Sequence, residues 1–274
     1  MYNRVSGQSI ASNRADQSGQ SMDSGSFAQA LTECAQQESL SDGESFDQMG
    51  GCCSRPDANG YSPEPSDSST SSLSSDSNPS SPARPIRALF DYRTAELPEA
   101  NVNGICLGLA AEWLLDLNSS PSSRMSALQP GAQNHASAAV RQKQYEDAKT
   151  ELRNAGAGGS HDFQARGKML SDAGLHPSNE QTRYRFGSSS RINKIVNEIT
   201  ADPSVYVLSL RFAAGGRHSI ATSTSNGMTT LFDPNYGEFT VRSDQMGEVF
   251  KSLAERYRNP NQRDISTVVT QRVA

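Results

Sequence analysis

Residues 101–118 read NVNGICLGLAAEWLLDLN, and this stretch decides how the chain folds. Five of its residues recur at the spacing of one helix face: Cys106, Ala110, Trp113, Leu114 and Leu117. This spacing predicts a helix over about 106–118 that buries the face. Asn103-Gly104, directly before it, predicts a turn and a cap for the helix N-terminus.

The residues that follow predict a helical first half and a strand-rich second half of one domain. Further helices are expected over about 136–152, 163–173, 189–200 and 244–258, the last with Tyr257 on its buried face. Strands are expected over about 205–212, 218–224, 228–232, 238–242 and 265–269. Asn226-Gly227 predicts a two-residue hairpin turn within an antiparallel meander. We therefore expect an α+β fold, a helical part followed by an antiparallel sheet.

The first third of the chain differs in composition. Residues 1–85 carry 4 of the 25 basic and 11 of the 30 acidic residues, which leaves 21 basic and 19 acidic residues for 86–274. Residues 61–85 hold 11 Ser and 5 Pro. Such a composition cannot bury enough apolar surface to offset the entropy lost on ordering the chain. The sequence predicts disorder in residues 1–49 and 50–85 and a folded domain over 86–274.

Charge and composition also exclude several classes of protein. The near-neutral segment 86–274 offers no broad basic field for nucleic acid, and no apolar stretch reaches the ~20 residues of a membrane-spanning helix. The spacing of the cysteines and histidines indicates neither a disulfide framework nor a metal site. We expect a monomer without cofactor or metal, with free thiols in a reducing compartment.

Cys106 begins the predicted helix, where backbone N–H groups and the positive end of the helix dipole favour a thiolate. Cysteine is also often a small buried residue, so the spacing alone leaves a nucleophilic and a packing role equally open.

A histidine and an acid on the predicted hairpin favour the nucleophilic role. The two-residue turn places His218 opposite Asn235 and Ile220 opposite Asp233, so His218 and Asp233 lie diagonally on one sheet face. A histidine oriented by a carboxylate near a cysteine at a helix start is typical of thiol hydrolases. Asn235 is the alternative residue for orienting His218. The alternative to a catalytic role is that His218 is an ordinary sheet-edge histidine and that Asp233-Pro234-Asn235 only forms a turn.

Three short motifs occur in order: Asn101-x-Asn103-Gly104-Ile105-Cys106, Arg217-His218-Ser219-Ile220 and Phe232-Asp233-Pro234-Asn235-Tyr236-Gly237-Glu238-Phe239. Together they resemble the YopT/AvrPphB family of type III-secreted cysteine proteases, most closely its rhizobial members, over residues 86–274. The resemblance implies a papain-like fold with Cys106 as nucleophile, His218 as general base and then acid, and Asp233 orienting the histidine. It also implies that Asn101 helps to form the oxyanion hole with the Cys106 backbone N–H.

Residues 50–54 read GGCCS, which fits the N-myristoylation pattern, with Cys52 and Cys53 as candidates for palmitoylation. Because Gly50 is internal, this signal requires a cut after Met49. The family's plant-associated members cut themselves upstream of such a glycine. Internal translation from Met49 and a chance match are the alternatives.

The stretch before Gly50 resembles the self-cleavage junction of the rhizobial members, Asp47-Gln48-Met49 having Gln48 in place of a lysine. Residues 1–49 resemble the polar secretion signals of type III effectors, and the Ser-rich tract up to residue 85 is expected to act as a flexible tether.

The sequence therefore predicts a secreted effector thiol endopeptidase that cleaves itself after Met49 and is acylated at Gly50, Cys52 or Cys53. Its expected place of action is the host plasma membrane. Its expected substrate is a host protein, a cytoplasmic kinase rather than a prenylated small GTPase. A non-catalytic membrane adaptor that binds host kinases and a thiol acyltransferase are the alternative functions. The other histidines, His135, His161 and His176, have no recognisable partner and are expected on loops or on the surface.

Overall fold

The computed structural model describes residues 87–274. The candidate junction Met49-Gly50 and the acylation candidates Cys52 and Cys53 lie outside the described residues, so the predicted processing, disorder and domain boundary stay predictions.

The predicted helices and strands all occur in the predicted order, and the short elements 93–96, 121–127 and 182–185 are additional. The helices are α2 (Cys106–Leu115), α3 (Pro121–Ala127), α4 (Gln133–Asn154), α5 (His161–Asp172), α6 (Ser189–Ile199) and α7 (Met246–Arg258). The strands are β1 (Arg93–Glu96), β2 (Thr182–Arg185), β3 (Ser204–Phe212), β4 (Arg217–Ser225), β5 (Met228–Asp233), β6 (Gly237–Arg242) and β7 (Ile265–Arg272). Short 3-10 turns are η1 (Leu89–Tyr92), η2 (Val102–Gly104) and η3 (Ser243–Gln245).

The described residues form a seven-stranded sheet in the order β1-β6-β5-β4-β3-β7-β2, with every neighbouring pair antiparallel. The predicted meander, β3 to β6, is confirmed, and the hairpin has the predicted register, with Ala221 opposite Phe232. The edge strands β1 and β2 were not predicted. Each has four residues and depends on a partner distant in sequence, β6 for β1 and β7 for β2.

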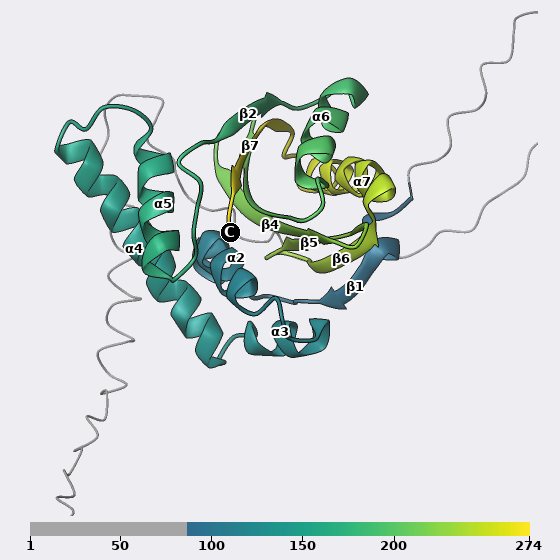
Figure 1. Cartoon of the computed structure of the whole chain (residues 1–274), viewed down its shortest axis with the longest axis horizontal. Coiled ribbons are helices and arrows are strands. Elements are labelled where there is room, and N and C mark those ends of the chain that lie inside the picture. Colours follow the sequence, from purple (N-terminus) through teal and green to yellow (C-terminus); the bar gives the residue numbers. More distant parts are fainter. Residues whose placement is uncertain (1–86) are drawn as a thin grey trace, which may run out of the picture. The chain divides into compact units, whose positions relative to one another are not determined.

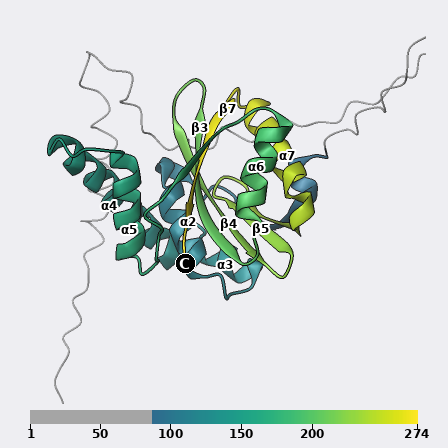
Figure 2. The ribbon, with the colours of Figure 1, turned by 45° about the horizontal axis from the view of Figure 1, so that its top comes forward.

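Helices cover both faces of this sheet, α6 and α7 on one side and α2, α4 and α5 on the other (Figures 1 and 2). Helix α6 buries its predicted apolar face: Ile192, Ile195, Val196 and Ile199. These residues pack with α7 and the apolar side chains of β3 and β4 in one core cluster. The sheet is therefore buried on both sides.

Helix α2 is buried all round, not on one face as predicted. Every residue from Cys106 to Leu114 is buried. A Cβ added at Gly108 would lie 1.9 Å from the carbonyl oxygen of Ala138 in α4, so only glycine allows this close approach. Sheet on one side and α4 on the other hold α2 at the centre of the described domain.

The cap of α2 also differs from the prediction. Asn103 and Gly104 form the expected turn, with φ angles of 59° and 69°, but no side chain caps the helix from its N-cap position. Instead Gln142 Oε1 of α4 accepts hydrogen bonds from the backbone N–H groups of Leu107 (3.2 Å) and Gly108 (3.3 Å). A tertiary partner thus satisfies N–H groups that every helix start leaves without an intrahelical acceptor.

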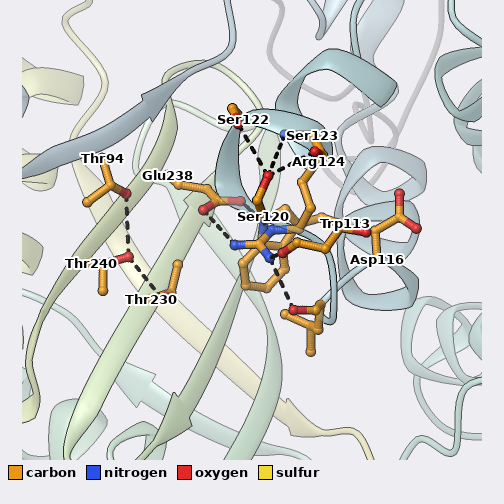
Figure 3. Close-up of polar contacts among 12 residues, drawn as sticks. Thr94, Trp113, Asp116, Ser120, Ser122, Ser123, Arg124, Thr230, Glu238 and Thr240 are labelled. Atoms are coloured by element: carbon orange, nitrogen blue, oxygen red, sulfur yellow. Dashed lines mark hydrogen bonds and ion pairs between the residues drawn. The ribbon is translucent and has the colours of Figure 1, made fainter.

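A buried ion pair locks α2 and α3 to the sheet (Figure 3). The guanidinium of Arg124 in α3 contacts both carboxylate oxygens of Glu238 in β6, at 2.7 and 2.9 Å. The indole N–H of Trp113 in α2 donates to Glu238 Oε1 at 2.6 Å. Trp113 also stacks on Phe232, with ring centroids 5.3 Å apart. This cluster fixes α2 against the β5–β6 hairpin.

Replacing Arg124 by methionine is expected to lower the free energy of unfolding by about 3–5 kcal/mol, because it leaves the Glu238 charge buried and uncompensated. The matched control is Arg258→Met, which removes exposed ion pairs to Glu255 and Asp264 and should cost about 0–1 kcal/mol. Urea denaturation of both variants measures the difference, and equal losses would contradict the locking role of Arg124.

Candidate active site

The thiol of Cys106 lies against the start of β4. Cys106 is the first residue of α2 and is fully buried. The backbone N–H of Ser219 points to its Sγ at 3.4 Å. Because Ser219 directly follows His218, the contact brings the predicted cysteine and histidine segments together across 112 residues of sequence.

His218 is held by Asp233, as the hairpin register predicted. His218 Nε2 lies 2.9 Å from Asp233 Oδ1, and both side chains are fully buried. With the proton on Nε2 directed at the carboxylate, Nδ1 of the neutral ring carries the lone pair. Nδ1 has no hydrogen-bond partner among residues 87–274. It is therefore the ring nitrogen that could act as a base.

Asn235, the alternative orienting residue, contacts other groups. Its side-chain Oδ1 accepts a hydrogen bond from Asn101 Nδ2 at 2.8 Å, and its Nδ2 donates to the Tyr257 hydroxyl at 3.0 Å. Its backbone N–H donates to Asp233 Oδ1 at 2.9 Å. Asn235 thus supports the carboxylate through its backbone and holds Asn101 through its side chain.

Tyr257 of α7 completes this network, a role that the sequence did not indicate. Its hydroxyl donates to Asp233 Oδ2 at 2.9 Å while it accepts from Asn235. Burial and the nearby Asp233 carboxylate raise the pKa of Tyr257 well above its usual value, so the hydroxyl stays protonated and able to donate. Periodicity placed Tyr257 on the buried face of its helix but gave no partner for its polar end. A continuous set of hydrogen bonds now runs from His218 to Asn101.

Two of the other histidines lie in helices rather than on loops. His135 in α4 is half-buried, with Nε2 2.9 Å from the carbonyl oxygen of Ala100. That contact holds the segment that carries Asn101. His161 begins α5, and its Nε2 lies 2.7 Å from the carbonyl oxygen of Ala157. Both residues are only partly buried, so the expected surface position stands and only the loop position is excluded. Their partners are backbone groups, which sequence spacing does not reveal.

Within residues 87–274 no group of three or more His, Cys, Asp or Glu side chains is placed to hold a metal ion. Over the same range, none of the helices is both long enough and apolar enough to span a bilayer.

Comparison with known proteins identifies relatives across this whole domain. The family described as Yersinia/Haemophilus virulence surface antigen matches residues 84–273. A protein of Bradyrhizobium diazoefficiens named as a YopT-like cysteine protease is 60% identical over all of this chain and 93% of its own length. Another of that description, from Sinorhizobium fredii, is 47% identical over the full length of both chains.

A solved structure extends the similarity to the fold. The cysteine protease avirulence protein AvrPphB of Pseudomonas savastanoi pv. phaseolicola is 31% identical over 64% of this chain and 66% of its own. The crystal structure of AvrPphB aligns with a TM-score of 0.64 and 28% identity, covering 68% of this chain and all of the crystallised one.

Replacing Tyr257 by phenylalanine is expected to slow alkylation of Cys106 by iodoacetamide at pH 7. Without the hydroxyl, Asp233 loses the donor at Oδ2, so the orientation of His218 loosens and less thiolate forms. The rate of Cys106 alkylation should fall at least about tenfold. This is less than the ~10²–10⁴-fold that a positioned base contributes in full, because His218 itself is still present. Peptide mass mapping measures the rate at Cys106 separately from the other cysteines.

Tyr236→Phe is the matched control for this measurement. Tyr236 is a buried tyrosine of the same aromatic group, but its hydroxyl contacts Asn261 instead of Asp233. The rate of Cys106 alkylation in Tyr236→Phe should match that in the unchanged chain. Equal rates in both variants would show that the Tyr257 hydroxyl does not position the base.

Proposed function

The chain belongs to the Yersinia/Haemophilus virulence surface antigen family, whose members similar to it are named cysteine proteases, and on this premise we propose how its residues hydrolyse a peptide bond. Membership confirms the resemblance that three short motifs predicted, including the relation to rhizobial proteins. The papain-like α+β fold and the assignment as a cysteine peptidase are confirmed as well.

In the proposed mechanism Cys106 Sγ attacks the carbonyl carbon of the scissile bond. His218 Nδ1 takes the thiol proton and then delivers it to the nitrogen of the leaving amine, which departs to leave a thioester on Cys106. The observation that carries this proposal is the position of His218. Asp233 holds it at Nε2, and it directly precedes the residue whose N–H contacts the thiol.

Water then hydrolyses the thioester, with His218 again acting as the base. We assign the oxyanion that forms in both steps to two donors, the side-chain amide of Asn101 and the backbone N–H of Cys106. The contact from Asn235 supports this assignment because it holds Asn101 in a fixed place five residues before Cys106. The chain belongs to a family of cysteine peptidases, and no observation on the described residues favours a membrane adaptor or a thiol acyltransferase over a peptidase.

Before acting on other proteins, the enzyme is proposed to cleave itself between Met49 and Gly50. This cut creates the N-terminal glycine amine that N-myristoylation requires. A single myristoyl chain binds membranes only marginally, whereas a palmitate on Cys52 or Cys53 would give a stable anchor. One proteolytic event would thereby convert a soluble precursor into a membrane-bound enzyme.

We place the processed enzyme at the plasma membrane of a host plant cell, reached through type III secretion. The family description and the name of AvrPphB connect these proteins with virulence and avirulence, which supports action inside a host. The proposed substrate is a host protein, a cytoplasmic kinase in preference to a prenylated small GTPase. The enzyme is proposed to act as a monomer without nucleic acid.

Self-cleavage is tested by intact mass and N-terminal sequencing of the purified chain beside Cys106→Ala. The unchanged chain is expected to begin at Gly50, because the thiol cuts after Met49. The Cys106→Ala chain is expected to stay full length. If both begin at Gly50, another protease or an internal start produces the N-terminus; if both stay full length, the Met49 junction is wrong.

Acylation is tested by fractionating plant cells that express the chain, with Cys106→Ala, Gly50→Ala and the double variant Cys52→Ser/Cys53→Ser for comparison. The unchanged chain should be found in the membrane fraction. Each variant should shift to the soluble fraction. Cys106→Ala removes the cut, Gly50→Ala removes the myristoylation site, and Cys52→Ser/Cys53→Ser removes the palmitoylation sites. Membrane binding that survives Gly50→Ala would contradict the proposed role of the glycine.

A further inference from the structure

Three buried or half-buried arginines gather on the α5-facing side of strands β3 and β4. We use the name arginine cluster for these three residues: Arg166 (α5), Arg211 (β3) and Arg217 (β4). Among residues 87–274 the cluster makes two ion pairs, and both end on one carboxylate, Asp162 of α5. The cluster therefore holds three positive charges against one negative charge.

The single carboxylate is already engaged. Arg217 forms a close ion pair with Asp162, which also accepts a hydrogen bond from the Tyr145 hydroxyl. Burial alone would raise the pKa of Asp162, but Arg217 and Tyr145 lower it below its usual value. Asp162 is consequently ionised and directed mainly at Arg217.

The other two arginines are poorly compensated. Arg211 Nη2 lies 3.9 Å from Asp162, and its buried Nε has no hydrogen-bond partner within the described part of the chain. Arg166 is 1% exposed, and its hydrogen bonds go to neutral side chains: Gln181, Ser209 and Gln271. Burial lowers the pKa of Arg166, and burial together with Arg217 lowers that of Arg211. Positive charge that is partly buried without a partner is costly, and an anion bound beside it would relieve that cost.

The cluster lies close to the thiol. Ser219, whose N–H contacts Cys106 Sγ, is two residues along β4 from Arg217, and residues two apart in a strand share a face. Their Cα atoms are about 7 Å apart at the ~3.3 Å rise of a strand. Arg211 is the pairing partner of Arg217 on β3. The Arg211 and Arg217 side chains are 27% and 25% exposed, so a bound peptide can reach them.

We propose that Arg211 and Arg217 form a subsite for an acidic side chain of the peptide substrate, two residues before the residue whose carbonyl is attacked. Arginine binds carboxylates through charge-assisted, often paired hydrogen bonds. Arg166 lies too deep for contact and adds to the positive potential. This proposal rests on the proposed peptidase function, and the feature that the subsite would select in a substrate is an acidic side chain.

The chain itself contains a matching peptide. Asp47 stands two residues before Met49 in the candidate junction. An extended peptide advances ~3.3 Å per residue, so the step from Met49 to Asp47 equals the step from Ser219 to Arg217. With the Met49 carbonyl at the thiol, the Asp47 carboxylate comes within reach of the exposed arginines.

The experiment measures cleavage of two substrates in trans: the full-length Cys106→Ala chain and the same chain with Asp47→Asn. The enzymes are the unchanged chain, Arg211→Gln and the control Arg191→Gln, which alters an exposed arginine of α6. For the unchanged enzyme and the control, kcat/KM should favour Asp47 by about 10–100-fold, the usual worth of a hydrogen bond to a charged group. In Arg211→Gln that preference should largely disappear.

Two results would overturn the subsite: equal cleavage of both substrates by the unchanged enzyme, or an unaltered preference in Arg211→Gln. Thermal unfolding of Arg211→Gln confirms that it is folded. Arg217→Gln serves as the second variant and should also lose the preference.

A binding measurement separates this proposal from the proposed function. If the unchanged enzyme cuts neither substrate, the junction assigned above is wrong, and fluorescence anisotropy then decides the subsite. Labelled peptides of residues 44–54, with Asp47 or with Asp47→Asn, are titrated with the Cys106→Ala chain and with Cys106→Ala/Arg211→Gln. Tighter binding of the Asp47 peptide that Arg211→Gln abolishes supports the subsite, and equal binding of the two peptides overturns it.

Discussion

The buried carboxylate of Asp233 is the constraint on which the rest of the candidate site depends. A carboxylate without access to water must be satisfied by protein donors, or it destabilises the fold by several kcal/mol, on the order of its desolvation cost. Here His218 and the backbone N–H of Asn235 share Oδ1, and Tyr257 occupies Oδ2. These donors come from strand β4, the turn after β5 and helix α7. The contacts that make the charge tolerable therefore also fix the histidine, so stability and positioning have the same origin.

The thiol depends on a different kind of constraint, a helix enclosed on every side. Gln142 satisfies the backbone at the start of α2, and Gly108 lets α4 approach closely. Seven residues beyond the thiol, Trp113 joins the Arg124–Glu238 ion pair. A helix anchored at both ends and along its side has little freedom to turn. Cys106 consequently meets β4 at a fixed place, where the backbone N–H of Ser219 points to its sulfur.

The parts of the molecule that the sequence predicted are those governed by local rules. A two-residue Asn226-Gly227 turn sets a register, and that register alone was enough to place His218 near Asp233. An apolar stripe likewise identifies α6. Two of the missed parts depend on tertiary partners: the edge strand Thr182–Arg185 requires β7, and the Gln142 cap joins two helices. Helix α3 was also missed, although its N-cap Ser120 and Pro121 are local signals. Tyr257 belongs to both groups. Its burial follows from the periodicity of its helix, but its hydrogen bonds to Asp233 and Asn235, which lie outside that helix, do not.

Strand β4 separates two tasks by the alternation of its side chains. His218 packs near the Tyr257 ring on the α7 side, whereas its neighbour Arg217 pairs with Asp162 of α5 on the opposite side. Successive strand residues point to opposite faces, so the two networks share a backbone but no side chain. The contacts that orient the base can then stay constant while the charge on the other face changes. Because the proposed chemistry needs only the first network, a substitution on the α5 side of β4 would alter the proposed subsite without altering the contacts of the histidine.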